Sequence, residues 1–240
     1  MLYHGRESYR KNSQLILFNF YKNLILVLPQ LWYGMNNYFS SANIYDPWIY
    51  QLYNVVYTSL PIAIFAIYDE KFNSKFSLEH PELYREGLDN KLFNFRKVSL
   101  WFVFPIMFSF FLATLTFVGL EESINSQGYM FDMVSSGMCI FAQCVLICNI
   151  RVLTISFRYS IGLILSVVLG VVLFWLTMAV AARIFYQSSE IVNMISLQIK
   201  SLEYWATIVM NVSLVFTIEV AMSNWKVLNE KIKTALSQVK

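Results

Sequence analysis

Six long apolar segments constrain this chain more than any other feature of its sequence. Each has about 20 mostly apolar residues, the length at which an α-helix crosses the hydrocarbon core of a bilayer. Over the whole chain 57% of the residues are hydrophobic and 14% are charged, against about 25% charged in a typical soluble domain. We therefore expect an all-α membrane protein with six transmembrane helices, at about residues 14–33, 48–68, 98–120, 130–152, 159–185 and 204–225.

The positive charges predict the orientation of these helices. If the N-terminus is cytoplasmic, all Lys and Arg residues lie on the cytoplasmic side except Arg183, Lys200 and, within the first span, Lys22. This is the positive-inside pattern, so we expect both termini to be cytoplasmic. The loop at residues 69–97 is then the longest cytoplasmic connection and a docking surface for another domain. Basic residues next to spans are typical of anionic-lipid contacts, and we expect no nucleic-acid partner.

Polar side chains distinguish the first two spans from the others. Lys22 lies roughly 12 Å into the first span at 1.5 Å per residue, with Asn19 and Asn23 beside it. Asn54 and Thr58 project from one face of the second span. A central Lys costs about 2.5–3.5 kcal/mol, so Lys22 either snorkels or pairs locally to fix packing, or it marks a polar pathway. The neighbouring amides favour the pathway, which we expect Lys22, Asn23, Asn54, Asn19 and Thr58 to line.

Each of these two spans also contains a proline. Pro29 and Pro61 have no N–H, and they free the carbonyls four residues earlier, those of Ile25 and Tyr57. A freed carbonyl at membrane depth needs a partner. We therefore predict a helix kink at each proline, with the freed carbonyl facing protein or water.

Few other residues are candidates for chemistry. The thiols of Cys139, Cys144 and Cys148 lie in one apolar run and are predicted to be buried and without a metal. Neither histidine has metal-ligand spacing around it. The chain has no phosphate-binding glycine loop and no Ser–His–Asp arrangement. We predict no catalytic residue and no metal site.

Four residues in the later spans receive separate predictions. Asp132 lies near the exoplasmic end of the fourth span, where we expect it to be solvated. Glu219 lies deeper in the sixth span and is either protonated or paired with a polar group on another helix, for packing or for a coupled function. Gly162 and Gly170 in the fifth span are interpreted as packing notches rather than as a dimer motif.

Three stretches of the sequence resemble one known family. HGRESYRK, followed by FYKN, is similar to the start of the fifth membrane helix in the phospholipid-flippase (type IV) branch of the P-type ATPases. YDPWIYQLYNVVYTSLPIAIFAIYDE resembles the sixth helix of that family, and HPELYREG with LFNFR resembles the cytoplasmic loop that follows. These stretches cover about residues 3–96, and the four later spans match the remaining helices in number and order. The resemblance implies that residues 1–240 are the C-terminal transmembrane domain of a P-type phospholipid-translocating ATPase.

This resemblance also implies a function and partners. Members of the family use ATP to move phospholipid from the exoplasmic to the cytoplasmic leaflet, together with a two-span accessory subunit. The Lys and Asn of FYKN and the Asn of YN, here Lys22, Asn23 and Asn54, are implied to handle the lipid head group. One departure is Ala66, where the family often has a glycine shortly after SLP.

The chain lacks the parts of the family that perform ATP hydrolysis. Its sequence contains no Asp-Lys-Thr-Gly phosphorylation motif, no nucleotide-binding domain and no counterpart of the first four membrane helices. Whether it is an enzyme by itself is therefore left open. We expect no cofactor bound by this segment, while ATP and Mg²⁺ are implied for the complete protein. The missing N-terminal pump domains are then partners of a fragment, a truncated gene product or a separately encoded half.

Two alternatives to a flippase segment stay open at this point. One is a stand-alone six-span channel or secondary transporter with Lys22, Asp132 and Glu219 along its pathway, although we find no inverted repeat in the sequence. The other is a non-transporting truncated fragment. All three readings place the chain as a multi-pass integral protein, in the plasma membrane or in a Golgi or endosomal membrane.

Overall fold

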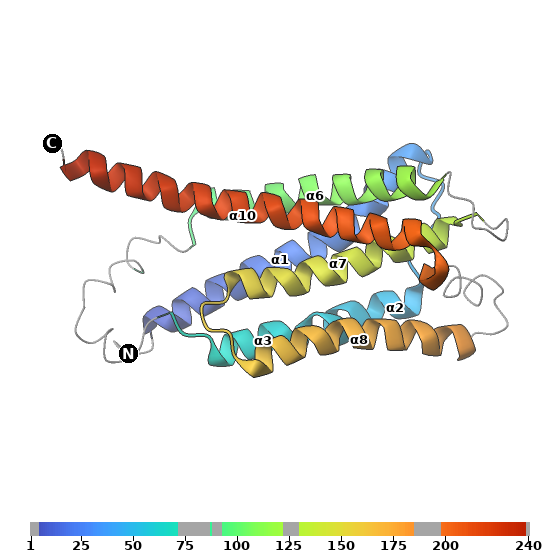
Figure 1. Ribbon diagram of the computed structural model, residues 1–240, viewed down its shortest axis with the longest axis horizontal. Helices are drawn as coiled ribbons and strands as arrows, with labels where there is room; N and C mark the ends of the chain where they lie inside the picture. The colour runs from blue at the N-terminus through green and yellow to red at the C-terminus, as the bar shows by residue number, and fades with distance from the viewer. Residues whose placement is uncertain (1–4, 72–86, 88–92, 122–129, 185–197, 239–240) are drawn as a thin grey trace.

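The described part of the protein is a bundle of long helices that lie side by side (Figure 1). The structure, a computed structural model, describes residues 5–71, 87, 93–121, 130–184 and 198–238. Its main elements are α1 (Gly5–Asn36), α2 (Pro47–Leu52), the π-helix η1 (Tyr53–Tyr57), α3 (Ser59–Tyr68), α6 (Phe95–Glu121), α7 (Met133–Ile155), α8 (Ile161–Ile184) and α10 (Leu202–Gln238).

Six of these helical stretches are long and apolar enough to cross a membrane, where α2, η1 and α3 together form the second, Pro47–Tyr68. The predicted class, an all-α protein with six spans, is confirmed, and the chain is a multi-pass integral membrane protein. The first described residues and the C-terminal end of α10 lie at the same end of the bundle (Figure 1), as an even number of spans requires. We call this the terminal end. That it faces the cytoplasm stays a prediction.

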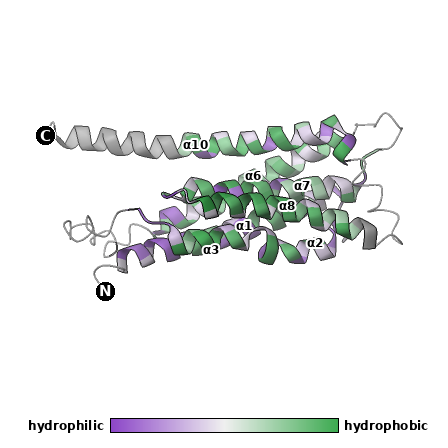
Figure 2. Cartoon of the chain, turned by 60° about the horizontal axis from the view of Figure 1, so that its bottom comes forward, coloured by the Kyte–Doolittle hydropathy of each residue, from purple (hydrophilic) through white to green (hydrophobic). Residues whose placement is uncertain are grey.

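The helix ends differ from the predicted spans because helices continue beyond the apolar stretch. α1 begins at Gly5 rather than near Gln14, and α10 continues to Gln238 rather than ending near Trp225. Both extensions consist largely of residues with ordinary or good helix propensity, so nothing in them stops the helix where the apolar run ends. Figure 2 shows the same division, with green apolar ribbon along the middle of the bundle and purple at the beginning of α1. Most of the loop predicted at residues 69–97 lies outside the described residues.

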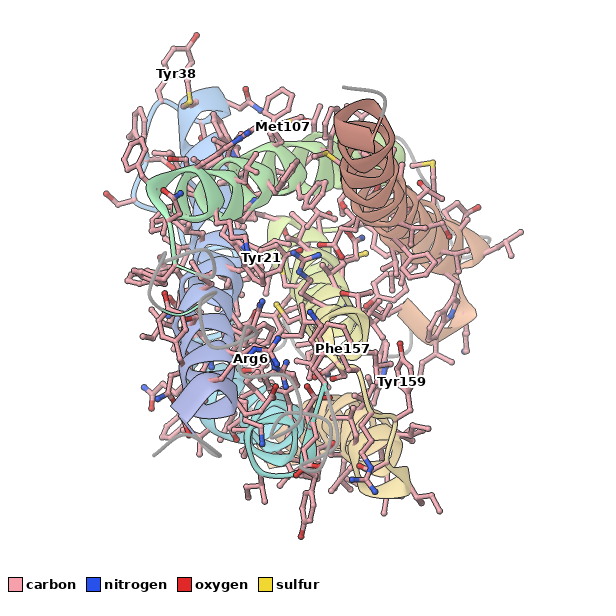
Figure 3. The ribbon with its side chains drawn as sticks, turned by 90° about the vertical axis from the view of Figure 1, so that its left-hand side faces the viewer. Arg6, Tyr21, Tyr38, Met107, Phe157 and Tyr159 are labelled. Carbon is pink, nitrogen blue, oxygen red and sulfur yellow. The ribbon has the colours of Figure 1, made fainter. Side chains whose placement is uncertain are left out.

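α7 is the central helix of the bundle. Viewed from the terminal end, it lies between α1, α6, α8 and α10 (Figure 3), and it contacts each of them as well as α3. Within its membrane-crossing window 67% of the residues are buried, against 28% for α8. Any polar side chain on α7 must therefore find its partner inside the protein.

The second span is interrupted, whereas the first is not. After α2 the backbone widens into the π-helix η1, leaves helical geometry at Thr58 (φ −123°, ψ −10°) and resumes as α3 at Ser59. The break lies one turn before Pro61, where the proline ring would crowd the carbonyl of Tyr57. α1 continues through Pro29 as one helix. π-helical turns are rare and frequently lie at functional sites.

Candidate functional site

Lys22 lies inside the bundle and faces the interruption of the second span. Its side chain is buried, at 5% exposure, and Nζ donates a hydrogen bond to Thr58 Oγ1 at 3.4 Å. Among the described residues no carboxylate lies within ion-pair distance of this ammonium group. The positive charge is therefore held by a hydroxyl at long hydrogen-bonding distance, which leaves donors of Lys22 available for an anionic or carbonyl oxygen.

The π-helix holds the backbone around this lysine. Tyr53 Oη donates to the backbone oxygen of Lys22 at 3.0 Å and also lies 3.1 Å from Cys148 Sγ. The hydroxyl of Thr58 donates to the carbonyl of Tyr53 at 2.8 Å. Tyr53 and Thr58 are both fully buried. The interrupted turn thus provides both a hydrogen bond to the main chain of Lys22 and the acceptor for its side chain.

The three asparagines proposed for the pathway do not share this enclosure. Asn23 and Asn54 are exposed on the surface of the chain, and Asn19 is half-buried. None of the three side chains has a hydrogen-bond partner within the described part of the chain. The structure therefore brings Lys22 and Thr58 together, and it leaves Asn23 and Asn54 on a surface that no described residue covers.

The carbonyls freed by the two prolines both have partners, as predicted. Cys144 Sγ donates to the carbonyl of Ile25 at 3.3 Å, and Asn149 Nδ2 donates to the carbonyl of Tyr57 at 3.3 Å. Both donors belong to α7. The sequence indicated that such donors must exist, but it did not identify them, because nothing in the local sequence shows that α7 lies against both spans.

A second polar cluster joins four helices near the terminal end. Arg151 of α7 forms an ion pair with Glu219 of α10 at 3.1 Å, and Tyr21 Oη of α1 donates to the same carboxylate at 2.9 Å. The Arg151 guanidinium carbon lies 4.5 Å from the ring centroid of Trp101 on α6 and 5.4 Å from that of Tyr21. Of the two alternatives for Glu219, pairing with another helix is the one observed. The cluster borders a cavity of about 810 Å³, lined mainly by apolar and aromatic side chains.

Asp132 and the cysteines occupy the surroundings predicted for them. Asp132 is exposed and is the N-cap residue of α7, where Oδ1 accepts from the backbone N of Met133 at 2.7 Å. All three cysteines are free and buried. Among the residues that the structure describes, no group of three or more His, Cys, Asp or Glu side chains could hold a metal ion.

These observations define a class of protein: a six-span helical membrane protein with a buried lysine beside an interrupted helix. Comparison with known families identifies it further. Residues 1–231 match the family described as the C-terminal region of phospholipid-translocating P-type ATPases, and the chain belongs to this family. The resemblance noted in the sequence is thereby confirmed.

Curated relatives carry corresponding names. The chain is 32% identical over 199 residues to the phospholipid-transporting ATPase DNF1 of Saccharomyces cerevisiae, which covers 79% of this chain and 12% of that protein. It is 30% identical over 162 residues to the probable phospholipid-transporting ATPase 12 of Arabidopsis thaliana, covering 68% and 13%. A Xenopus tropicalis protein, phospholipid-transporting ATPase IC, is 39% identical over 100 residues, covering 42% and 8%. The chain thus spans about an eighth of the length of the first two relatives.

Proposed function

We propose that this chain forms the membrane part of an ATP-driven phospholipid translocase, which moves lipid from the exoplasmic to the cytoplasmic leaflet. The observation that carries the proposal is the buried ammonium of Lys22, which faces the interrupted second span without a carboxylate among the described residues. A charged side chain in a membrane interior is costly and is retained where it serves a pathway. A phospholipid head group brings phosphate oxygens, which are suitable acceptors for an ammonium group.

The exposed asparagines support a pathway at the edge of this chain. Asn23 lies on the outer stripe of α1 between the exposed apolar side chains of Phe20 and Val27, and Asn54 lies beside exposed Val55. An amide turned toward acyl chains has no hydrogen-bond partner. We infer that the N-terminal pump domains of the family contribute helices that cover this surface, so that the lipid head group passes between those helices and the pair α1 and α2–α3.

The remaining partners belong to the complete protein. The family resemblance implies ATP and Mg²⁺ for the complete protein, and we assign their binding to its N-terminal pump domains. No step of ATP hydrolysis is assigned to residues of this chain. The two-span accessory subunit of the family would bind on the exoplasmic side.

The test uses a complete pump whose C-terminal membrane part is this chain. We expect Lys22→Ala and Asn54→Ala to impair phospholipid-stimulated ATP turnover. Lys200→Ala, which removes an exposed lysine at the end of the bundle opposite the terminal end, should leave this turnover unchanged. Unchanged turnover and unchanged lipid preference in both site variants would rule out the site. Ion or solute flux through vesicles that contain the chain alone, without ATP, would instead support a channel or secondary transporter.

A further inference from the structure

We propose that Asn149 of α7 is a positioning residue for Lys22, because it holds the backbone carbonyl that Pro61 leaves without its helical donor. The contact joins the centre of the bundle to the interruption of the second span. As a statement about lipid handling, the proposal rests on the proposed function. As a statement about the backbone, it stands on the geometry alone.

The carbonyl in question is that of Tyr57. In a regular helix its donor would be the N–H of residue 61, which a proline lacks. Asn149 Nδ2 lies 3.3 Å from this oxygen, and Asn149 is 1% exposed. Because the site is at membrane depth, water is not at hand to replace the missing donor. The amide of Asn149 therefore takes the place of the N–H that Pro61 removes.

α8 leaves room for this contact at one residue. A Cβ atom added at Gly170 would lie 2.6 Å from the carbonyl oxygen of Tyr57 and 3.2 Å from Asn149 Nδ2. Three helices thus meet within van der Waals contact around a single hydrogen bond. This close approach explains how the short side chain of Asn149 reaches the backbone of a neighbouring helix, and it agrees with the predicted packing notch.

The held carbonyl belongs to the peptide unit that precedes Thr58. Thr58 has a non-helical φ of −123°, and its hydroxyl is the acceptor for Lys22 Nζ at 3.4 Å. Rotation of the peptide unit between Tyr57 and Thr58 would move this hydroxyl with it. Asn149 therefore acts on Lys22 through two links, from its amide to the Tyr57 carbonyl and from Thr58 to the ammonium group.

A buried amide in a membrane helix could also serve packing alone. Asn211 of α10 is such a case: Nδ2 donates to Gln143 Oε1 at 3.0 Å and to Thr116 Oγ1 at 3.2 Å. It is as buried as Asn149, but the partners of its amide nitrogen are side chains of α6 and α7 rather than the backbone of the second span. Asn211 is therefore the matched control, because the same substitution there removes an equally buried amide.

The deciding experiment is a double-mutant cycle in the purified chain, followed by thermal unfolding. Pro61→Ala returns an N–H to residue 61 and so supplies Tyr57 with a second donor. We expect Asn149→Leu to lower the unfolding temperature clearly in the wild-type background and much less in the Pro61→Ala background. Asn211→Leu should lower the unfolding temperature equally in the two backgrounds.

Equal effects of Asn149→Leu in the two backgrounds would overturn the proposal, since independent sites are additive. If Asn149→Leu does not fold, Asn149→Ser allows the same comparison.

The functional part is measured in the complete pump. Asn149→Leu should raise the phospholipid KM about tenfold or more, as expected when a binding group is displaced by a remote change, and Pro61→Ala should restore it in the double variant. Asn211→Leu should leave KM unchanged. A rise in KM that Pro61→Ala does not restore would count against the positioning role. If the wild-type pump shows no response to phospholipid, the proposed function fails, while the unfolding cycle still decides the carbonyl contact.

Discussion

At the scale of single residues, the space around a helical glycine shows where two backbone segments of the bundle lie against each other. A Cβ at Gly137 of α7 would lie 1.9 Å from the carbonyl oxygen of Ile44, whereas a Cβ at Gly162 of α8 would meet nothing closer than the Ser160 hydroxyl at 4.0 Å. The connection between the first two spans therefore lies directly against the backbone of the central helix. The interpretation of Gly162 as a packing notch is therefore wrong, because no described neighbouring helix approaches it, whereas Gly137 and Gly170 each lie against the backbone of another segment.

We predict that Gly137→Ala destabilises the chain by about 3 kcal/mol, the upper part of the range for overpacking a filled interior. Gly162→Ala should be neutral or slightly stabilising, because alanine is the better helix former. Thermal unfolding in detergent, followed by the reaction of a thiol-specific dye with the three buried cysteines, measures both. Equal unfolding temperatures for the two variants would contradict the close approach at Gly137.

A second prediction at this scale concerns the ion pair of Arg151 and Glu219. Glu219→Gln keeps the shape of the side chain but leaves Arg151 without its carboxylate, so we expect a loss of about 2 kcal/mol. This is less than for a fully buried pair, because Arg151 keeps its contacts with the rings of Trp101 and Tyr21. Glu203→Gln, at an exposed carboxylate near the start of α10, is the control and should change stability little. A Glu219→Gln variant as stable as the wild type would show that the pair contributes nothing.

At the scale of elements, the sequence predicts what depends on one segment at a time. The six spans follow from apolar length, and the unsatisfied carbonyls of Ile25 and Tyr57 follow from Pro29 and Pro61. The π-helix at Tyr53–Tyr57 does not follow, because it depends on contacts with other helices. Asn149 and Tyr57 are 92 residues apart, and no local pattern links them. Sequence reasoning thus identifies the need for a partner, and only the packing of helices identifies the partner.

Asp69 joins three elements at the terminal end, which no sequence pattern revealed. Its Oδ2 accepts from Arg10 of α1 at 2.7 Å, and its Oδ1 accepts from the backbone N–H groups of Phe157 and Arg158 at 2.8 and 2.9 Å. The carboxylate therefore connects the end of α3, the first turns of α1 and the link between α7 and α8. Its neighbour Glu70 lies 3.8 Å from Arg158, and both side chains are largely exposed.

We predict that Asp69→Asn destabilises the chain by about 2 kcal/mol, since it removes one of the two carboxylates that pair with the buried guanidinium of Arg10 and leaves Glu7, at 2.9 Å, as the other. Glu70→Gln should have little effect, because exposed ion pairs contribute little. Both are measured by thermal unfolding of the chain at neutral pH. If Glu70→Gln is as destabilising as Asp69→Asn, net charge rather than the buried pair determines the effect.

At the scale of the whole molecule, the candidate site was predicted only in part. Helical periodicity placed Lys22 and Thr58 on polar faces of adjacent spans, and the structure brings those faces together. The same arithmetic placed Asn23 and Asn54 on polar faces of the same spans, and the structure leaves both exposed, so that their place in a pathway stays a prediction. Periodicity assigns a residue to a face of its own helix. It does not say which neighbour covers that face, and for these two asparagines none of the described helices does.

The last prediction concerns the orientation of the bundle in its membrane, which follows from charge and not from packing. Tyr38, between α1 and α2, is 95% exposed, and Tyr159, between α7 and α8, is 64% exposed near the terminal end. Figure 3 shows that the side chain of Tyr38 points away from the bundle. Since the native cysteines are buried, a cysteine at either position is the reactive thiol within the described part of the chain.

We expect an impermeant maleimide to label Tyr38→Cys in intact cells, and to label Tyr159→Cys only after the membrane is permeabilised. The physical reason is the positive-inside pattern, which keeps segments rich in Lys and Arg on the cytoplasmic side. The wild-type chain serves as the control for background labelling. The reverse pattern would place the terminal end outside. Because Lys22 lies between the two labelled positions along the bundle, the same result decides which leaflet lies on the Tyr38 side of this lysine.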